Sequence, residues 1–268
     1  MELLFSPLFS GSSGNAVYVG EGDGGILVDA GVSCARIVKE LEKIGVKPES
    51  LKAILITHEH TDHISAAGIL SRKFDLPIYA TEGTWGGMAD KVGAVQSKNV
   101  RIIDARQDFY IGKINVCPFS IPHDASDPCG YTFFSGNLKA SIATDIGCVR
   151  EGWLNAVAGS DIVLLEANYD EDMLKAGKYP YTLKKRILGR SGHLSNDDAG
   201  KAAAELAKRN CRNIILGHLS KENNFPELAD QTVRLALTEA GCEIGRDVNL
   251  SIARRDGFSG LFQLNDNA

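Results

Sequence analysis

Long apolar runs, paired cysteines and an excess of positive charge are all missing from this sequence. Among its 268 residues, no apolar run approaches the roughly 18 that a membrane-spanning helix needs. The first residues carry no basic stretch and no cleavage-like site, so we expect no secretory signal peptide. The six cysteines are scattered without a CxxC pair, as is typical of a reducing compartment. We therefore expect a soluble cytoplasmic protein that does not act in a membrane.

The charge balance sets a limit on the partners of the chain. A net charge of -5 gives no overall positive field that would attract nucleic acid or an acidic membrane, although a local basic surface remains compatible with it. Hydrophobic residues make up 44% of the chain, which is enough for a sizeable core. Because no linker or low-complexity tract divides the sequence, we predict a single domain over residues 1–268.

Half of the histidines lie in one short stretch, THEHTDH at residues 57–63. A short apolar run of the length of a buried strand precedes it directly, and strand ends in α/β sheets are where ligands collect. Imidazole nitrogen and carboxylate oxygen are ligands of borderline metals. The spacing therefore predicts a metal site in which His58 and His60 face one ion while Asp62 and His63 face a second.

Three more residues of this type, His123, Asp145 and His218, each follow a predicted strand. Either histidine alone would more often be a packed or surface residue, but the cluster makes convergence of these strand ends the simplest explanation. Two ions about 3.5–4 Å apart would activate a shared water and clamp a phosphoryl oxygen, and Asp62 could orient that water. The predicted ligands are His58, His60 and His123 for one ion, Asp62, His63 and His218 for the other, and Asp145 as a bridge.

The expected elements form two similar halves, each rich in strands and then helical. Strands are expected at residues 3–9, 16–19, 25–28, 53–56, 77–80, 100–103, 109–111, 114–121, 131–134, 139–143, 162–165, 214–216 and 250–253. Helices are expected at residues 33–43, 66–74, 81–91, 153–158, 196–208 and 226–240. This order predicts an α/β fold in which two sheets pack together with helices outside both.

The spacing HxHxDH at residues 58–63, followed by His123, Thr144-Asp145 and Gly217-His218, resembles the metallo-β-lactamase-fold hydrolases. The resemblance runs through nearly the whole chain and implies a four-layer αβ/βα sandwich. His60 stands where the oxygen-reducing flavodiiron branch has Glu. A hydrolytic centre with two divalent metal ions, zinc or manganese, is therefore favoured over a redox di-iron centre.

Four segments resemble the YycJ/WalJ group of bacterial proteins, namely SGSSGN at 10–15, THEH at 57–60, ATEGTW at 80–85 and RSGHLSN at 190–196. That group is regarded as 5′–3′ exonucleases acting on DNA, so the resemblance implies a phosphodiester hydrolase of this kind. The first of these segments could present backbone N–H groups to an anion, which makes Ser13 and Asn15 candidate substrate-binding residues. The alternative for this loop is a plain hairpin turn.

Glu166 and His193 stand in segments that resemble the Glu and His motifs of tRNase Z. There a histidine that is not a metal ligand, held by a glutamate, is thought to act as proton donor. The resemblance implies that Glu166 would orient His193 and favour its charged form. His193 would then protonate the leaving 3′ oxygen. The alternative is that His193 only caps the following helix or binds solvent.

Residues 175–190 carry six basic side chains and no acidic one, with Tyr179 and Tyr181 between them. We call this segment the basic strip. Lysine, arginine and aromatic side chains suit contact with a nucleic-acid backbone and stacking on bases, although a solvated helix face would look the same. The predicted substrate-binding residues in the strip are Lys184, Lys185, Arg186 and Arg190.

The leading hypothesis is a metal-dependent exonuclease whose partner is nucleic acid, DNA rather than RNA. The alternatives are a phosphodiesterase acting on small molecules or cyclic nucleotides, and a non-catalytic DNA-binding regulatory protein with a structural metal site. The sequence leaves open the choice between zinc and manganese, the strand polarity, and whether the chain forms a homodimer.

Overall fold

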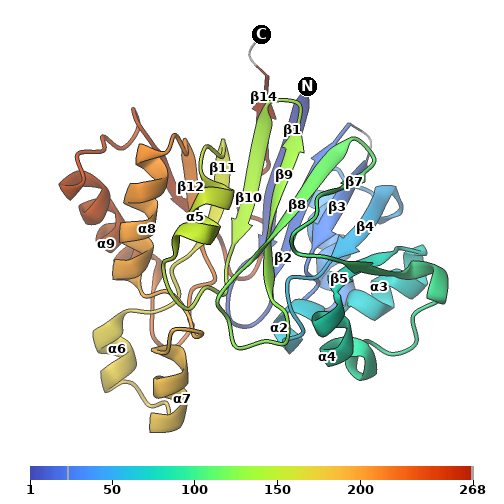
Figure 1. The fold of residues 1–268 in the computed structure, drawn as a ribbon, viewed down its shortest axis with the longest axis horizontal. Helices are drawn as coiled ribbons and strands as arrows, with labels where there is room; N and C mark the ends of the chain where they lie inside the picture. The colour runs from blue at the N-terminus through green and yellow to red at the C-terminus, as the bar shows by residue number, and fades with distance from the viewer. Residues whose placement is uncertain (23, 267–268) are drawn as a thin grey trace.

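Two β-sheets pack face to face, and helices cover the outer face of each (Figure 1). The computed structural model describes residues 1–22 and 24–266. In spatial order, the first sheet contains β14 (Phe262–Asn265), β1 (Glu2–Phe9), β2 (Ala16–Glu21), β3 (Gly24–Val28), β4 (Leu51–Leu55), β5 (Ile78–Thr81) and β6 (Val100–Ile103). The second contains β13 (Asn249–Ile252), β12 (Asn213–Gly217), β11 (Ile162–Glu166), β10 (Leu138–Ala143), β9 (Cys129–Ser135), β8 (Ile114–Ser120) and β7 (Phe109–Ile111).

Each sheet combines a parallel half with an antiparallel half. Strands β3 to β6 of the first sheet run parallel to one another, and so do β10 to β13 of the second. Because parallel strands end at one edge of a sheet, the loops after β3 and β4 emerge together, and so do those after β10, β11 and β12. The candidate site lies on these loops.

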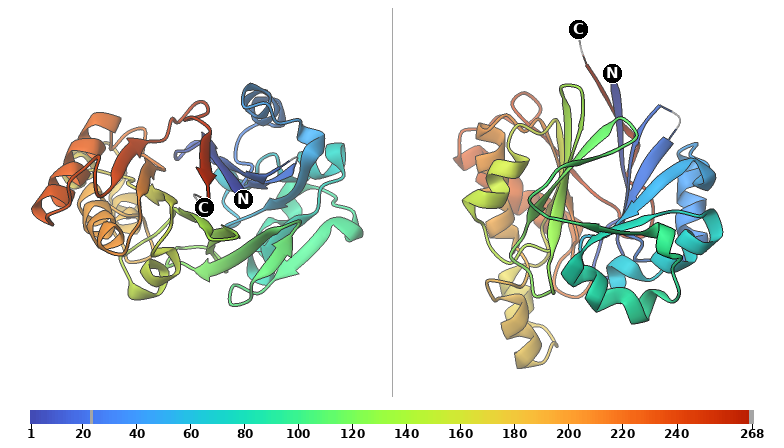
Figure 2. Two further views of the ribbon diagram at one scale, coloured as in Figure 1. Left: turned by 90° about the horizontal axis from the view of Figure 1, so that it is seen from above. Right: turned by 45° about the vertical axis from the view of Figure 1, so that its right-hand side comes forward.

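The helices form the two outer layers, as the view from above in Figure 2 shows. Helices α1 (Cys34–Lys43), α3 (Ala67–Phe74) and α4 (Glu82–Val92) pack on the first sheet, and α5 (Glu151–Val157), α8 (Asn196–Lys208) and α9 (Pro226–Glu239) on the second. The short helix α2 (Thr61–Ile64) lies at the strand ends, and α6 (Glu171–Ala176) and α7 (Tyr181–Ile187) project beyond them. Single 3₁₀ turns span Pro48–Ser50 and Ser97–Asn99. Among the described helices, none is long and apolar enough to cross a membrane.

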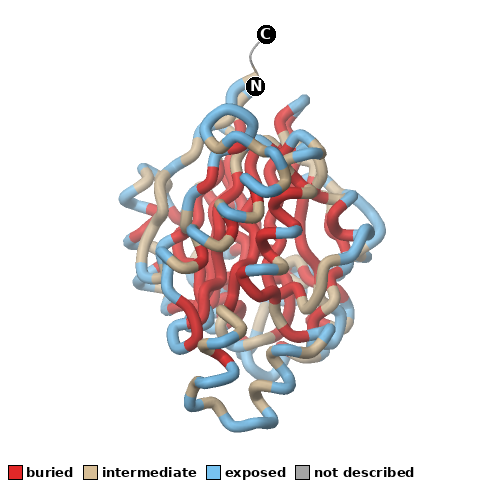
Figure 3. Tube along the Cα trace, turned by 90° about the vertical axis from the view of Figure 1, so that its left-hand side faces the viewer, coloured by how far each residue is buried: buried red, intermediate tan, exposed pale blue. Residues whose placement is uncertain are grey.

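The four layers follow from strands that are apolar on both faces. In β2, Val17 and Val19 pack between the two sheets, whereas Ala16 and Tyr18 pack toward the helices of the first sheet. Successive side chains of a strand point to opposite faces, so a strand buried on both sides needs an almost continuous apolar run. Figure 3 shows the result as two buried sheets inside exposed outer turns.

The predicted α/β fold with two sheets and outer helices is confirmed, and each predicted strand and helix is present to within a few residues. Helices α2, α6 and α7, strand β14 and the two 3₁₀ turns were not predicted. Helix α7 has only seven residues, and none of them is buried. Strand β14 has only four residues, and two of them are exposed.

Candidate metal centre

Backbone strain marks the ends of three strands. Asp29 after β3, Asp145 after β10 and His218 after β12 have φ angles of 60°, 59° and 56°. This left-handed region is unfavourable for residues other than glycine, and such strain persists only where the surroundings hold it. The backbone N–H of His218 donates to Ser10 Oγ at 2.9 Å, and its carbonyl accepts from Asn168 Nδ2 at 2.8 Å. The strained turns therefore aim their side chains at one region.

The loop after β4 brings three imidazoles together, two of its own and one from the loop after β8. His58 Nε2 lies 3.0 Å from His60 Nδ1, and His123 Nε2 lies 3.3 Å from the same atom. Nitrogens bound to one tetrahedral zinc, with bonds of about 2.0–2.1 Å, lie about 3.3 Å apart. The spacing of His58, His60 and His123 is therefore that of three ligands around one ion.

Asp62, His63 and His218 form a second group within 4.8 Å. His63 Nε2 lies 3.5 Å and His218 Nε2 3.7 Å from Asp62 Oδ2. Asp145 stands between the two groups, because its oxygens lie 3.5 Å from His63 Nε2, 3.5 Å from His218 Nε2 and 3.8 Å from His123 Nε2. The structure therefore gathers all seven predicted ligands, with Asp145 at the position expected of a bridge.

Two buried atoms in this cluster test whether a cation fits. His218 Nε2 and Asp145 Oδ2 are shielded from solvent, and neither has a hydrogen-bond partner among the described residues. Buried polar atoms are normally paired, because leaving one unpaired costs about 1–3 kcal/mol. A divalent ion would satisfy both atoms, so the donor set fits a metal.

The second nitrogen of the buried imidazoles is held from outside the cluster. His63 Nδ1 lies 2.8 Å from Asp29 Oδ2, His123 Nδ1 lies 3.0 Å from the carbonyl of Gly192, and His218 Nδ1 lies 2.9 Å from Glu166 Oε1. Contacts of this kind fix the tautomer and turn the other nitrogen toward the metal. Asp29 has this role without having been predicted. The signal available for it was a carboxylate directly after a buried strand.

The pKa values of the cluster separate its histidines into two kinds. Burial lowers the pKa of His58, and neighbouring imidazoles lower it further; burial also lowers the pKa of His60 and of His123. Burial opposes a charge on His63 and His218 as well. There, however, Asp145 and other carboxylates outweigh burial and raise the pKa of His63 well above its ordinary value and that of His218 to about 10.

For the carboxylates, burial and the neighbouring charges shift the pKa in the opposite directions to those found for His63 and His218. Burial would raise the pKa of Asp62 and of Asp145, but the surrounding imidazoles outweigh burial and hold both values low. The carboxyl groups therefore stay ionised. The concentrated negative charge of Asp62 and Asp145 is the kind of environment that a divalent cation neutralises.

Glu166 joins the metal cluster to His193. Its side chain is fully buried, and Oε1 lies 2.8 Å from His193 Nδ1 and 2.9 Å from His218 Nδ1. Burial raises the pKa of Glu166, but His193 and His218 outweigh burial and hold it low. Asp145, Glu166, His193 and His218 also lie close enough to share an ion. Both Nδ1 atoms are occupied by Glu166, however, so we describe these residues as a hydrogen-bonded network.

A cavity of about 390 Å³ opens over the cluster. Of the predicted substrate-binding residues, Arg186 lines it and its guanidinium pairs with Asp124, whereas Ser13, Asn15, Lys184, Lys185 and Arg190 do not line it. The lining residues are Ser12, His60, Thr61, Asp62, Asp124, Asp145, Asn168, Tyr179, Leu183, Arg186, Ile187, Gly192, His193, His218 and Ser220.

The residues outside the cavity have identifiable surroundings. Asn15 is buried beneath the cluster, where its Oδ1 accepts from the Gly11 N–H and its Nδ2 lies 3.1 Å from His63 Nε2. Lys184 and Lys185 lie on another face of α7, around a separate hollow. Sequence reasoning missed Ser12, Asn168 and Ser220. It singled out the segment at 10–15 but selected Ser13 and Asn15 there, and nothing distinguished Asn168 and Ser220 from ordinary loop residues.

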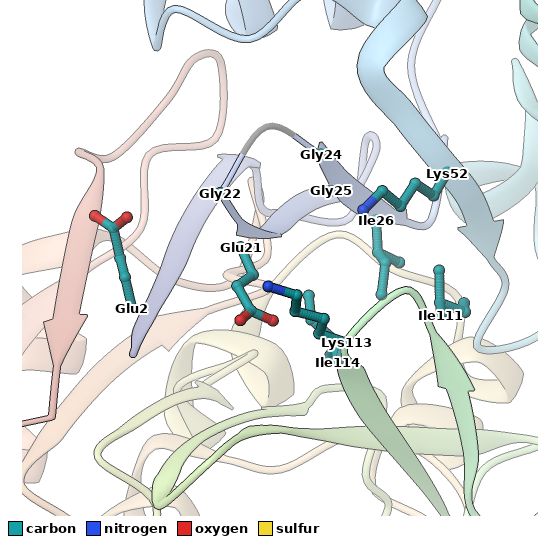
Figure 4. A pocket seen from close by; sticks show the side chains of 10 residues that line it. All are labelled: Glu2, Glu21, Gly22, Gly24, Gly25, Ile26, Lys52, Ile111, Lys113 and Ile114. Carbon is teal, nitrogen blue, oxygen red and sulfur yellow. The ribbon is translucent and has the colours of Figure 1, made fainter.

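A second cavity, of about 270 Å³, lies at the opposite ends of β3 and β4 (Figure 4). Its lining includes Glu2, Glu21, Lys52 and Lys113, with aliphatic side chains and glycines between them. Histidine is absent from its described lining residues. The metal-ligand constellation therefore belongs to the end of the sheets that carries His58 and His218.

Comparisons with known proteins agree with this arrangement. Residues 25–218 match the family model of the beta-lactamase superfamily domain. The chain is 38% identical to exodeoxyribonuclease YycJ of Bacillus anthracis, over 91% of this chain and 93% of the relative. It is 41% identical to exodeoxyribonuclease WalJ of Streptococcus pneumoniae, over 91% of both chains.

A solved structure shows the same architecture. The metallo-beta-lactamase fold protein YhfI of Bacillus subtilis superimposes with a TM-score of 0.72 at 16% identity, covering 96% of this chain and 99% of that one. At this identity the match concerns the fold alone, and it agrees with the two sheets and outer helices described above. On its fold, its ligand cluster and its relatives, the chain belongs to the β-lactamase superfamily and has the metallo-β-lactamase fold.

Proposed function

We propose that this protein is a metal-dependent phosphodiester hydrolase that acts as an exonuclease and removes nucleotides from the 5′ end of DNA. The observation that carries the proposal is the convergence of seven ligand-type side chains in one cluster, four of which line the cavity, with the Glu166–His193 pair beside them. The YycJ and WalJ relatives, named exodeoxyribonucleases, match over nine-tenths of the chain and support DNA as the substrate.

Two divalent ions, zinc or manganese, would supply a nucleophilic water near neutral pH and neutralise the charge of the phosphate. His58, His60 and His123 would hold one ion, and Asp62, His63 and His218 the other, with Asp145 shared. The side chain of Asp62 is 28% exposed and lines the cavity, so it can also accept a hydrogen bond from the attacking water.

His193 is placed to act as the proton donor. It lines the cavity with 21% of its side chain exposed, and its ring centroid lies 5.1 Å from that of His123 and 5.3 Å from that of His218. Because Glu166 holds Nδ1, the Nε2–H of a protonated His193 is free to donate. Protonation of the leaving 3′ oxygen is the step for which a phosphodiester needs such a group.

The location and the assembly of the protein are part of the proposal. All six cysteines are free in the described part of the chain, and thiols of this kind persist in a reducing compartment. We therefore place the activity in the cytoplasm. All seven predicted metal ligands and His193 come from this one chain, so we propose that a second copy need not supply a metal ligand.

The test is digestion of DNA and RNA labelled at the 5′ or the 3′ end, with added Mn²⁺ or Zn²⁺, beside a small chromogenic phosphodiester. Stepwise release from the 5′ end of DNA is the expected result. Hydrolysis of the small diester alone would move the protein to the small-molecule phosphodiesterases. No hydrolysis by protein that contains one firmly bound ion would favour a regulatory DNA-binding protein with a structural metal.

A further inference from the structure

Helix α7 carries an apolar stripe that does not enter the core. Leu183 and Ile187 are four residues apart on this helix, and Tyr179 lies in the segment just before the helix begins. In an amphipathic helix such spacing marks the face that packs on the protein interior. All three side chains are only half-buried, and all three line the cavity over the metal cluster.

The remainder of the cavity wall is polar. It consists of four metal-ligand residues, His193, Asp124, Arg186 and Gly192 together with serine, threonine and asparagine residues. Tyr179, Leu183 and Ile187 are therefore the apolar part of the lining. A charged phosphate group gains no favourable interaction from apolar side chains. The part of a nucleotide with apolar faces is its base, and aromatic side chains bind bases of every kind by stacking.

We propose that Tyr179, Leu183 and Ile187 form a subsite for the base of the terminal nucleotide, which we call the base wall. The inference rests on the proposed nuclease function and adds the part of the substrate that is recognised. The cavity volume of about 390 Å³ lies at the lower end of the range of about 300–1,000 Å³ found for small-ligand sites. One nucleotide rather than a continuous strand would occupy it.

The base wall is fixed relative to the proton donor. The backbone N–H of His193 donates to the carbonyl of Ile187 at 3.2 Å. Gly192 has no room for a side chain, since a Cβ there would lie 2.1 Å from the same carbonyl oxygen. A base on the wall would therefore stand at a set distance from His193, which places the adjoining phosphodiester toward the metal cluster.

Arg186 adds a charge to the same face of α7. It follows Leu183 by three residues, lines the cavity and pairs with Asp124 beside His123. Residues three apart are neighbours on a helix surface. A guanidinium next to the base wall suits the phosphate of the nucleotide whose base the wall holds.

The helix also supplies a matched control. Tyr181 lies two residues from Tyr179, but its exposed fraction is 79% and it borders the separate hollow with Lys184, Lys185 and Leu188. Replacing Tyr181 removes the same aromatic group from a surface that the cavity does not reach. Tyr179 is only half-buried and Tyr181 is exposed, so neither Tyr179→Ala nor Tyr181→Ala removes a core side chain.

The experiment compares digestion of single-stranded DNA that ends in a normal 5′ nucleotide with digestion of the same strand ending in an abasic 5′ nucleotide. The native protein should prefer the normal end by about tenfold or more, the order expected from loss of one stacked base. Tyr179→Ala should lose this preference, while Tyr179→Phe and Tyr181→Ala should keep it. Retention of the full preference by Tyr179→Ala would overturn the base wall.

Binding of the product separates this inference from the proposed function. Calorimetry on the metal-loaded protein compares deoxyadenosine 5′-monophosphate with deoxyribose 5-phosphate, which lacks the base. A tighter Kd for the nucleotide that Tyr179→Ala abolishes supports the base wall even if the nuclease assay fails. Equal Kd values in the native protein refute it even if DNA is digested.

Discussion

Replacement of Glu166 by glutamine tests how one buried carboxylate serves both the metal cluster and the proton donor. Glu166 is fully buried and accepts four hydrogen bonds. Oε1 faces the Nδ1 atoms of His193 and His218, and Oε2 accepts from the backbone N–H groups of Ile146 at 2.7 Å and Leu194 at 3.2 Å. Glutamine keeps the shape but offers one accepting oxygen and one donating NH₂ group.

Either orientation of the glutamine leaves donors facing donors. If its NH₂ points at Ile146 and Leu194, two buried N–H groups lose their acceptor. If its NH₂ points at the imidazoles, both Nδ1 atoms must give up their proton, and His218 then carries a proton on Nε2, the atom that faces Asp62 and Asp145. Because hydrogen bonds to a charged group contribute about 1.5–3 kcal/mol each, we expect Glu166→Gln to cost about 2–3 kcal/mol of stability.

The assays are thermal unfolding, metal content and nuclease rate. In a chain of this size the expected loss of stability corresponds to a fall in Tm of about 4–12 °C. Metal affinity should fall about 10- to 100-fold through His218, and kcat by about 10²-fold or more through His193. Native kcat and metal content in folded Glu166→Gln would refute the reasoning.

Glu59→Gln is the control for this substitution. Glu59 is also buried next to the cluster, but its Oε1 accepts from the backbone N–H and hydroxyl of Ser126, at 2.8 and 2.7 Å, instead of holding an imidazole. The same chemical change there should leave kcat and metal content close to native. A loss equal to that of Glu166→Gln would mean that any buried carboxylate near the site has the same effect.

Three further substitutions separate the roles of the site residues. His193→Ala should lower kcat by about 10²-fold or more with normal metal content, as expected for loss of a general acid, and an unchanged kcat would remove His193 from the mechanism. Asp145→Ala should lose both metal and activity, so retention of two ions by mass spectrometry would disprove the bridge. Arg186→Gln should raise KM for DNA and flatten its salt dependence, whereas Lys185→Gln, on another face of α7, should change KM less; equal effects would contradict the placement of Arg186 in the cavity.

The ligand cluster could be predicted because most of its information is local. Four of the seven ligands lie within residues 58–63, and the others follow strands that are apolar enough to recognise. The parallel strand order then brings those ends together, which is a property of the fold class. Asp29 was missed because its partner, His63, is 34 residues away and nothing near Asp29 in the sequence indicates that contact.

The orientation of the basic strip could not be predicted for a different reason. Tyr179 lies just before α7 and lines the cavity, whereas Tyr181 is the first residue of the helix and borders a separate hollow. The sequence shows both aromatics but not where α7 begins or which side meets the cavity, because no residue of α7 is fixed by the core. Asn15 similarly stood in a loop typical of anion contact, yet its side chain is buried, where it accepts from the Gly11 N–H and lies against the imidazole of His63.

The division of the ligands between the two sheets has a consequence for assembly. His58, His60, Asp62 and His63 follow a strand of the first sheet, whereas His123, Asp145 and His218 follow strands of the second. Metal ions bound here would cross-link the two sheets, because neither half of the chain supplies the full set of ligands. Because the ions bind only the folded chain, free metal at 100 times its Kd would add about 2.7 kcal/mol to the free energy of unfolding. The supply of metal would thus determine the stability of the packing between the two sheets as well as the nuclease activity.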